Sequence, residues 1–222
     1  MFTGIVQAIG AVHQSQRRGK ALRLFIDAGR WNYAPKARIG DSVCVAGVCL
    51  TLVHARRPSS RPTRRILEFD VVAETLDKTT LGSLPRGRKV NLEHAATAST
   101  LLGGHLVQGH VDGIGRISKV QRGEDWRVWI DLPNTLRVWM VSKGSVAIDG
   151  VSLTIAGLTR RGIWVALIPE TLEKTTLADL DVGDTVNVEA DVIAKMVAKA
   201  REFAVRKPKS PARRKTTRPR RP

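Results

Sequence analysis

The sequence predicts an all-β protein of two similar small domains, each a closed barrel or a sandwich, followed by one α-helix. Three blocks of sequence recur in the same order in the two halves of the chain, and such a repeat is typical of a duplicated structural unit. Apolar and polar residues alternate with a period of two in several short stretches, which indicates half-buried antiparallel strands. A helical period of apolar residues begins only after residue 190.

The duplication is clearest in residues 74–93 and 170–189, which are identical at 12 of 20 positions. Residues 40–51 and 143–154 share six of twelve positions, and residues 1–12 and 106–117 share four of twelve. The offset between the halves falls from 103 at the block that starts at residue 40 to 96 at the block that starts at residue 74. The first half therefore carries seven extra residues, which we assign to a surface loop rich in arginine and proline around residues 56–65.

Individual strands follow from the alternation. Residues 126–132 place Val128, Ile130 and Leu132 on the same face as Trp126. Residues 66–71 alternate in the same way, with two opposite faces made by Leu67, Phe69 and Val71 and by Ile66, Glu68 and Asp70. Residues 43–53 are almost continuously apolar around Gly47, which predicts one bulged or sharply bent strand that another group approaches closely.

The C-terminal segment changes to a helical period. Its apolar stripe is formed by Ile193, Val197, Ala200 and Ala204, with Met196 and Phe203 at the sides. Asp191 precedes this stripe and is placed to cap the start of the helix. A single amphipathic helix needs a surface to cover its stripe, and either a barrel or copies of the helix in other subunits would serve.

Composition excludes several classes of protein. The 222 residues contain no apolar run long enough for a membrane span, and the first residues do not form a signal peptide. Two cysteines cannot form a disulfide scaffold, and no Cys/His pair has zinc-finger spacing. We therefore expect a soluble protein of a reducing compartment, the cytoplasm, with no metal site.

The net charge of +17 is concentrated at the C-terminal end. Residues 206–222 hold nine basic residues and no acidic one, whereas residues 1–205 hold 28 basic and 20 acidic residues. This tail has four prolines and only Ala212 as an apolar residue, so we predict that it is disordered. A nucleic-acid-binding barrel would need a basic face with exposed aromatic residues, so we expect no nucleic-acid partner except through the tail.

The duplicated blocks place polar side chains where a small molecule could bind. Cys49-Leu50-Thr51 corresponds to Ser152-Leu153-Thr154, and the first and third residues of each triplet share one face of a strand. A thiol or hydroxyl beside a threonine hydroxyl can hydrogen-bond the edge of a flat polar heterocycle. Glycine-containing segments at residues 4–6 and 109–111 let backbone amides approach a ligand, and Glu-Thr pairs at 74–75 and 170–171 complete the two sets.

Each of these features also has a purely structural explanation. A single cysteine in an apolar strand is usually a small buried hydrophobic residue, a role that suits Cys44 better because five residues separate it from Cys49 and turn it to the other face. Strand threonines reflect β propensity, and Gly103-Gly104 is typical of a turn. His105 and His110 without a third ligand make a poor metal site. Only the recurrence of the whole set favours a binding site.

The two halves differ where catalysis would need a difference. The second half has Asp149, Ser152, His110 and Asp191 at the positions where the first half has Ala46, Cys49, Ile5 and Ala95. Unequal polar groups in a symmetric fold suggest that the two barrels hold a substrate in two different roles.

Taken together, these motifs resemble the riboflavin synthase family of the alpha-chain type. The resemblance rests on MFTGIV at 1–6, GGHLVQGHVDG at 103–113, DGVSLT at 149–154, IPETLEKTTL at 168–177 and VNVEAD at 186–191, and it extends from residue 1 to about residue 203. It implies two six-stranded antiparallel Greek-key barrels, residues 1–97 and 98–190. A helix over residues 191–205 would hold a homotrimer together, and the tail would follow at 206–222.

The resemblance also implies a reaction, the dismutation of two 6,7-dimethyl-8-ribityllumazine molecules. One molecule would give a four-carbon unit to the other, yielding riboflavin and 5-amino-6-ribitylamino-pyrimidinedione without a metal or an organic cofactor. Each barrel would bind one lumazine, and the N-terminal barrel of one subunit would face the C-terminal barrel of the next. The alternative is a non-catalytic lumazine- or flavin-binding protein, which Ala46 favours because the family often has Asn there.

The site residues implied by the resemblance form two pockets. The N-terminal pocket would be lined by Gly4, Ile5, Val6, Cys49, Leu50, Thr51, Asp70, Val71, Val72, Ala73, Glu74 and Thr75. The C-terminal pocket would be lined by Gly109, His110, Val111, Lys143, Ser152, Leu153, Thr154, Ala166, Leu167, Ile168, Pro169, Glu170 and Thr171. The ligand would be activated by Ser152, His110, Asp149 and Thr154, with Cys49 and Ser42 opposite them, Phe2 over the ring and Asp191 toward a ribityl hydroxyl or the partner site.

Overall fold

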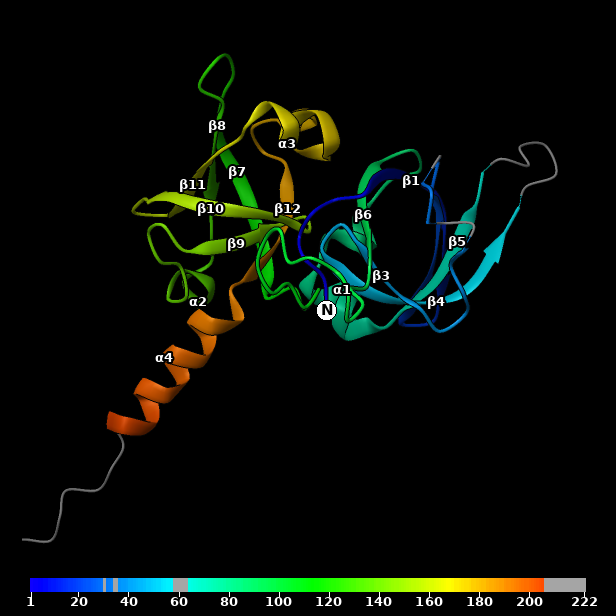
Figure 1. Ribbon diagram of the computed structural model, residues 1–222, viewed down its shortest axis with the longest axis horizontal. Coiled ribbons are helices and arrows are strands. Elements are labelled where there is room, and N and C mark those ends of the chain that lie inside the picture. Colours follow the sequence, from blue (N-terminus) through cyan, green and yellow to red (C-terminus); the bar gives the residue numbers. More distant parts are fainter. Residues whose placement is uncertain (30, 34–35, 58–63, 206–222) are drawn as a thin grey trace, which may run out of the picture.

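The computed structural model describes residues 1–29, 31–33, 36–57 and 64–205, which form two barrels side by side and a helix that projects from the second (Figure 1). The strands of the first barrel are β1 (Ala8–Arg18), β2 (Ala21–Asp27), β3 (Ser42–Val45), β4 (Val48–Arg56), β5 (Ile66–Val71) and β6 (Lys89–His94). They close in the order β1-β2-β5-β4-β3-β6. Strands β3, β4 and β5 are sequential neighbours and β2 lies beyond β5, which is a Greek-key connection.

The second barrel repeats this topology strand by strand. Its strands are β7 (Gly113–Gln121), β8 (Arg127–Asp131), β9 (Ser145–Ile148), β10 (Val151–Leu158), β11 (Gly162–Ala166) and β12 (Thr185–Ala190), closed in the order β10-β11-β8-β7-β12-β9. All pairings in both barrels are antiparallel. The prediction of two duplicated six-stranded barrels is confirmed, and the domain boundary at residues 97 and 98 stays a prediction.

Short helices fill the same connections in both barrels. In the first barrel, α1 (Ala73–Lys78) and the 3-10 turn η2 (Thr80–Ser83) link β5 to β6, and in the second, α3 (Pro169–Lys174) and η3 (Thr176–Asp179) link β11 to β12. A further short helix, α2 (Asn134–Arg137), lies between β8 and β9. At each helix-to-turn junction a threonine hydroxyl donates to a backbone carbonyl at 2.6 Å, Thr79 to Thr75 and Thr175 to Thr171. This junction follows the Glu-Thr pair of each repeated block, so the duplicated sequence builds the same corner twice.

The alternation predicted for β8 is confirmed, because Val128 and Ile130 are each 1 % exposed and lie in the core of the second barrel. The strand at residues 66–71 departs from a simple alternation. Glu68 is only 5 % exposed although it lies outside the core, because Arg23 and Arg56 form ion pairs with its carboxylate and cover it. An ion-paired carboxylate can therefore be buried on the outer face of a barrel.

Residues 43–53 form two strands and not the single bent strand that their apolar run predicts. A tight turn at Ala46-Gly47 separates β3 from β4, with φ of 47° and 82°. Because the strands pair directly, Cys44 lies opposite Cys49 on the same face, which corrects the prediction that the two thiols point apart. The close approach predicted at Gly47 is confirmed, since a Cβ there would lie 2.7 Å from the backbone nitrogen of Gly150.

The C-terminal helix is α4 (Val192–Val205), and its predicted start is confirmed, because the Asp191 carboxylate accepts a hydrogen bond of 2.9 Å from the N–H of Ile193. Lys195 fixes the helix to the second barrel through an ion pair of 2.9 Å with Asp112. Figure 1 shows the helix pointing away from both barrels. Its predicted apolar stripe is largely uncovered in the single chain, with Ile193 at 58 % and Val197 at 63 % exposure.

The two barrels meet in a seam with approximate two-fold symmetry. The buried side chain of Asn91 on β6 donates to the carbonyl of Asp149 at 2.9 Å and accepts from the N–H of Thr176 at 2.8 Å. Asn187 on β12 does the same in the other direction, donating to the carbonyl of Ala46 at 2.7 Å and accepting from Thr80 at 2.8 Å. Each amide therefore joins its own barrel to both the hairpin and the turn of the other barrel.

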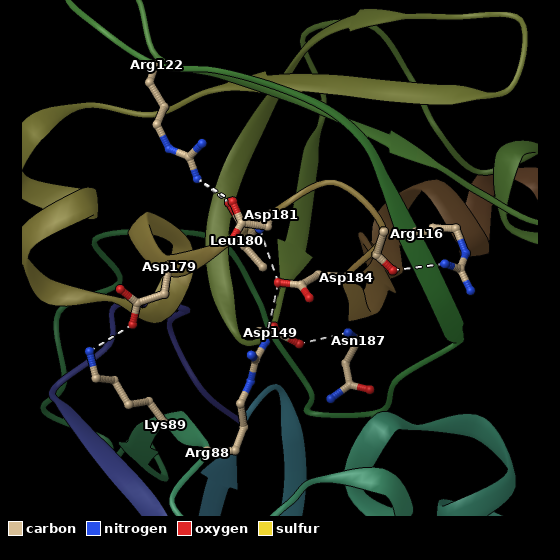
Figure 2. Close-up of polar contacts among 11 residues, drawn as sticks. Arg88, Lys89, Arg116, Arg122, Asp149, Asp179, Leu180, Asp181, Asp184 and Asn187 are labelled. Atoms are coloured by element: carbon tan, nitrogen blue, oxygen red, sulfur yellow. Dashed lines mark hydrogen bonds and ion pairs between the residues drawn. The ribbon is translucent and has the colours of Figure 1, made fainter.

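Charged groups surround this seam (Figure 2). Lys89 of the first barrel forms an ion pair of 2.8 Å with Asp179 of the second, and Arg88 lies 3.7 Å from Asp184. Asp149 sits beside them at the tip of the β9–β10 hairpin, where its carboxylate accepts a hydrogen bond of 2.7 Å from the N–H of Asn187. The seam thus combines buried amides with ion pairs at its edge.

Two predictions fall outside the described residues. The disordered basic tail at 206–222 and the middle of the arginine- and proline-rich loop, residues 58–63, belong to the part of the chain for which no placement is described. Within the described residues, no helix has the length and apolar character needed to span a membrane.

Candidate functional site

Two short segments cross between the barrels, the first crossing segment (residues 2–6) and the second crossing segment (residues 107–111). They meet where Phe2 and Val107 exchange two backbone hydrogen bonds of 2.7 and 3.1 Å. The carbonyl of Gly4 then accepts from the N–H of Ser152 on β10 at 2.8 Å. The carbonyl of Gly109 accepts from the N–H of Cys49 on β4, also at 2.8 Å. Each segment therefore docks on a strand of the opposite barrel.

This exchange corrects the pocket assignment that the resemblance implied. Residues 4–6 do not belong to the N-terminal pocket, nor residues 109–111 to the C-terminal one, because Val6 packs against the core of the second barrel and Val111 against the first. Sequence position shows in which half a segment lies, but not with which barrel its backbone pairs. The other residues of each set stay with the barrel to which they were assigned, and only residues 4–6 and 109–111 change places.

Glycine is required at the centre of both crossing segments. Gly4 and Gly109 have φ of 74° and 75°, in the left-handed region that side chains disfavour. A Cβ on Gly4 would lie 2.6 Å from the Cβ of Ser152, and one on Gly109 would lie 2.7 Å from the Cβ of Cys49. The missing side chains let each segment lie directly on the strand that carries the thiol or the hydroxyl.

The second crossing segment closes one side of a cavity of about 210 Å³ on the first barrel. The floor is the start of β4, the opposite side is α1, and the lining residues are Val48, Cys49, Glu74, Thr75, Lys78, Thr79, Gly109, His110 and Val111. The polar groups among these residues are a thiol, a carboxylate, an ammonium group, two hydroxyls and an exposed imidazole. Such a set can bind a polar ring on its edge. The sequence predicted Cys49, Glu74 and Thr75 for one pocket, and the structure adds His110, which was assigned to the other.

The second barrel repeats this construction with different chemistry. Ser152 replaces Cys49, and its hydroxyl lies 2.7 Å from Nδ1 of His105. Glu170 on α3 forms an ion pair of 2.7 Å with Lys174 at the place where α1 carries Glu74 and Lys78. Ile5, which is 50 % exposed, lies where the first barrel has His110. The two barrels are therefore alike in backbone at these equivalent places and unlike in polar groups.

His105, whose role the sequence left undecided, is the residue that the structure places beside Ser152. Burial lowers the pKa of its imidazole, and the nearby carboxylate of Asp191 opposes this shift only in part. Burial therefore favours the neutral imidazole, and in the contact with the Ser152 hydroxyl Nδ1 is the acceptor or the donor according to the tautomer. Its sequence signal was present but weak: His105 precedes the second crossing segment within GGHLVQGHVDG, and the repeat gives it no counterpart, because residues 106–117 correspond to residues 1–12.

Asp149, expected to activate the ligand, lies in the barrel seam. Its carboxylate is hydrogen-bonded to the backbone of Asn187. Burial raises the pKa of Asp149 to about 7, against the influence of that hydrogen bond and of Arg88. The structure thus places Asp149 in the turn at the tip of the β9–β10 hairpin, three residues before Ser152, where its carboxylate contacts the backbone of β12.

The remaining predicted residues divide into four groups. Thr51 and Thr154 are exposed and lie on the same strand faces as Cys49 and Ser152, with Ser42 paired across from Thr51. Lys143 is exposed in a left-handed turn before β9. The side chains that point into the barrel cores are Leu50, Val71, Leu153 and Leu167. The exposed residues around α1 and α3 are Val72, Glu74, Ala166, Ile168, Pro169 and Glu170, with Ala73 and Thr171 half-buried beside them.

Two predicted residues are engaged away from the cavity. Phe2 is fully buried in a cluster with Cys44, Val107 and Ala147, where it supports the first crossing segment from behind. The Asp70 carboxylate accepts two hydrogen bonds of 2.6 and 2.7 Å from Arg23 on β2, which lower its pKa. Among the described residues, no cluster of three or more His, Cys, Asp or Glu side chains is placed to hold a metal ion.

The geometry defines a class of protein, a duplicated barrel with two equivalent sites of unequal polar groups, and comparison with known proteins agrees. The Lumazine binding domain model matches twice, at residues 3–95 and 108–191. Riboflavin synthase of Mycobacterium tuberculosis (strain ATCC 25618 / H37Rv) is 44 % identical over 208 residues, covering 89 % of this chain and 96 % of that protein. Riboflavin synthase of Bacillus subtilis (strain 168) is 38 % identical over 197 residues, covering 88 % and 87 %.

Solved structures show the same fold. The LumP complex with 6,7-dimethyl-8-(1'-D-ribityl) lumazine superposes with a TM-score of 0.74 at 27 % identity, and the LumP complex with riboflavin with a TM-score of 0.75 at 29 % identity. Both comparisons cover 86 % of this chain and 99 % of the other. The chain belongs to the riboflavin synthase family, whose members carry the lumazine-binding domain twice.

Proposed function

We propose that this protein is a riboflavin synthase, which converts two molecules of 6,7-dimethyl-8-ribityllumazine into riboflavin and 5-amino-6-ribitylamino-pyrimidinedione. The observation that carries the proposal is a pair of equivalent sites with the same backbone and unequal polar groups, Cys49 with His110 at the cavity of the first barrel and Ser152 with His105 on the second barrel. A reaction between two identical molecules needs such a difference, because one molecule donates a four-carbon unit and the other accepts it. The enzyme is thus a transferase.

The chemistry requires a base and a stabilised anion. The 7-methyl group of the bound lumazine ionises because its anion delocalises into the pyrimidinedione ring, and the proton must be taken up nearby. The hydroxyl of Ser152 and the neutral imidazole of His105 form a polar pair suited to this transfer. Thr154 and Lys143 would bind the ring edge, Cys49 and Ser42 would serve the acceptor, and Asp191 would bind a ribityl hydroxyl. Asp149 would act through the hairpin that it supports.

Holding two rings in register supplies much of the remaining rate. Orientation of two reactants can contribute about 7–11 kcal/mol to lowering a barrier. We propose that the N-terminal pocket of one subunit faces the C-terminal pocket of the next in a homotrimer. The uncovered apolar stripe of α4 supports this arrangement, because Ile193 and Val197 would be buried by copies of the helix. We place the protein in the cytoplasm, with lumazine as its small-molecule partner and no cofactor.

The direct test is incubation of the purified full chain with the lumazine, without added metal, while substrate loss and flavin absorbance are recorded. Two lumazine molecules should disappear for each flavin formed. Tight binding of one lumazine per pocket with no flavin formed would instead identify a non-catalytic lumazine-binding protein and would overturn the proposal.

Replacing Ser152 by alanine tests the assigned polar pair. We expect Ser152→Ala to lower kcat by about 10²- to 10⁴-fold, the range for loss of a proton-transfer group, while the lumazine dissociation constant changes much less. Ser118→Ala is the matched control, because Ser118 is exposed on β7 and its hydroxyl bonds only the Trp129 carbonyl. Equal losses in turnover and in binding would remove Ser152 from the proton-transfer role.

A further inference from the structure

Two buried carboxylates have no role in the reaction described above. Glu93 on β6 is 3 % exposed and Glu189 on β12 is 2 % exposed. Neither forms an ion pair with a cation of the described residues. Burial raises the pKa of both groups, and at Glu189 the charge of Lys195 offsets this rise only in part. A buried carboxylate without an ion pair is costly, so the hydrogen bonds that it receives indicate what it does.

Those hydrogen bonds come from the crossing segments. The two oxygens of Glu93 accept from the N–H of Thr3 at 2.7 Å and from the N–H of Gly4 at 3.0 Å, and the Thr3 hydroxyl adds a third bond of 2.8 Å. The two oxygens of Glu189 accept from the N–H of Gln108 at 2.7 Å and of Gly109 at 2.9 Å. The same arrangement therefore occurs in both halves, with one oxygen for each of two consecutive N–H groups.

Only a carboxylate satisfies this geometry. Two adjacent backbone donors that converge on one side chain need two acceptor atoms, which an ionised Glu has and a Gln has not. In Gln the amide nitrogen would face an N–H group, so one hydrogen bond would be lost and one donor left unpaired in a buried position. An Asp is shorter by one methylene and would not reach both donors.

Each clamped segment also holds the pocket strand of the other barrel. The Glu189 carboxylate accepts hydrogen bonds from the N–H groups of Gln108 and Gly109, and the Gly109 carbonyl accepts one from the N–H of Cys49 on the first barrel. In the other direction, the Glu93 carboxylate accepts hydrogen bonds from the N–H groups of Thr3 and Gly4, and the Gly4 carbonyl accepts one from the N–H of Ser152. A continuous chain of hydrogen bonds thus leads from a carboxylate of one barrel to the reactive residue of the other.

We propose that Glu93 and Glu189 are crossed positioning residues: Glu189 of the second barrel sets the pocket around Cys49, and Glu93 of the first barrel sets the pocket around Ser152. The two pockets of one chain are therefore coupled through the crossing segments, because each pocket is held in place by the barrel that carries the other. That the pockets bind lumazine rests on the proposed function, whereas the crossed support rests on the contacts alone.

The thiol of Cys49 reports on its own pocket without any turnover. Cys49 is half-buried and Cys44 is buried, so a thiol reagent such as 5,5′-dithiobis(2-nitrobenzoate) modifies Cys49 first, which peptide mapping verifies. We expect Glu189→Gln to raise the modification rate of Cys49 about five- to tenfold, the change in local opening expected when a charge-assisted hydrogen bond is lost. The matched variant Glu93→Gln should leave this rate within about twofold of the unsubstituted protein.

The reporter can then be moved to the other pocket. In a chain with Cys49→Ser and Ser152→Cys, the expected pattern reverses, so that Glu93→Gln raises the modification rate and Glu189→Gln does not. Equal increases for both variants, or an increase only in the barrel that carries the substituted carboxylate, would overturn the crossed assignment. If either Gln variant fails to fold, Glu→Asp at the same position keeps the charge and must give the same crossed pattern.

Lumazine protection separates this inference from the proposed function. Saturating lumazine should slow Cys49 modification in the unsubstituted protein and should do so at higher concentration in Glu189→Gln. Crossed reactivity without any protection by lumazine would leave the positioning role in place and would contradict lumazine binding. Protection by lumazine without crossed reactivity would support lumazine binding and would contradict the positioning role.

Discussion

Ala46 and Asp149 occupy the same strained position at the tips of two equivalent hairpins. Both residues have positive φ, 47° and 45°, and each is followed by a glycine. A left-handed backbone costs a residue such as alanine roughly 1–2 kcal/mol, whereas Asn and Asp adopt it more readily. At Asp149 the side chain also accepts a hydrogen bond from Asn187. Ala46 has no group that could make the equivalent bond to Asn91.

We expect Ala46→Asn to raise the free energy of unfolding by about 1 kcal/mol. The repeat shows that the backbone accommodates a side chain of this size, because Asp149 fits the equivalent place in the second barrel. Urea unfolding of the variant measures the change. Ala46→Gly is the control. Glycine relieves the strain of the positive φ, but it raises the entropy of the unfolded chain and removes a buried methyl group. A higher free energy of unfolding for Ala46→Asn alone would therefore point to the hydrogen bond. A less stable Ala46→Asn protein would contradict the assignment of strain.

Asp149 should make the stability of the protein depend on pH. Its pKa is raised from 3.8 to about 7 in the folded state, so the folded protein binds this proton more tightly than the unfolded chain does. The contribution of this group to stability is therefore greatest below about pH 4 and is lost as the pH rises toward about 7. The ionised form is the costly one, because burial of the carboxylate is the main cause of the shift.

Asp149→Asn separates this effect from other titrations. The amide oxygen can still accept from the N–H of Asn187, and Asn tolerates the positive φ. We expect the variant to be more stable than the unsubstituted protein at about pH 8 and less different from it at about pH 5. Urea midpoints at both values test this. A constant difference between the two proteins across that range would show that Asp149 does not titrate there.

At the scale of elements, sequence periodicity located the strands but missed how they turn. The apolar run at 43–53 contains a hairpin because Ala46-Gly47 adopts two successive left-handed conformations. The duplicated copy has Asp149-Gly150, and an Asp-Gly pair between apolar runs is a strong hairpin signal. Transfer of that signal through the repeat would have divided the run correctly. Hydrophobic periodicity alone cannot locate this turn, because the residues on both sides of the two-residue turn are apolar.

The crossing segments lie beyond such reasoning. Phe2 pairs with Val107, and nothing local in either segment indicates a partner so distant in sequence. The carboxylates that hold the segments did leave a trace, because Glu93 and Glu189 recur with Asn91 and Asn187 in the buried stretches VNLE and VNVE. A charged residue repeated in a buried strand predicts a buried donor that needs it. Which donor it is depends on the contact between barrels.

At the scale of the whole molecule, the two barrels are joined by reciprocal polar contacts beside a small apolar cluster of Phe2, Cys44, Val107 and Ala147. Asn91 and Asn187 each make one hydrogen bond as donor and one as acceptor across the seam. Both side chains are buried, at 2 % and 1 % exposure. Loss of either amide therefore leaves a buried backbone N–H and a buried carbonyl without their partners. The crossing segments span the same seam, so the geometry of both pockets depends on it.

We expect Asn187→Ala to lower the free energy of unfolding by about 2–4 kcal/mol, because two buried groups, the N–H of Thr80 and the carbonyl of Ala46, lose their partner at about 1–3 kcal/mol each and relax in part. Asn91→Ala should cost a similar amount, since the seam is nearly symmetric. Asn134→Ala, at an exposed position on α2, is the matched control and should change stability by less than about 0.5 kcal/mol.

Urea unfolding followed by tryptophan fluorescence resolves the outcome, because Trp31 belongs to the first barrel and four other tryptophans to the second. If the seam couples the barrels, the Asn187 variant should unfold in two steps where the unsubstituted protein unfolds in one. A single transition with an unchanged free energy of unfolding would mean that the barrels are held together by contacts other than these amides.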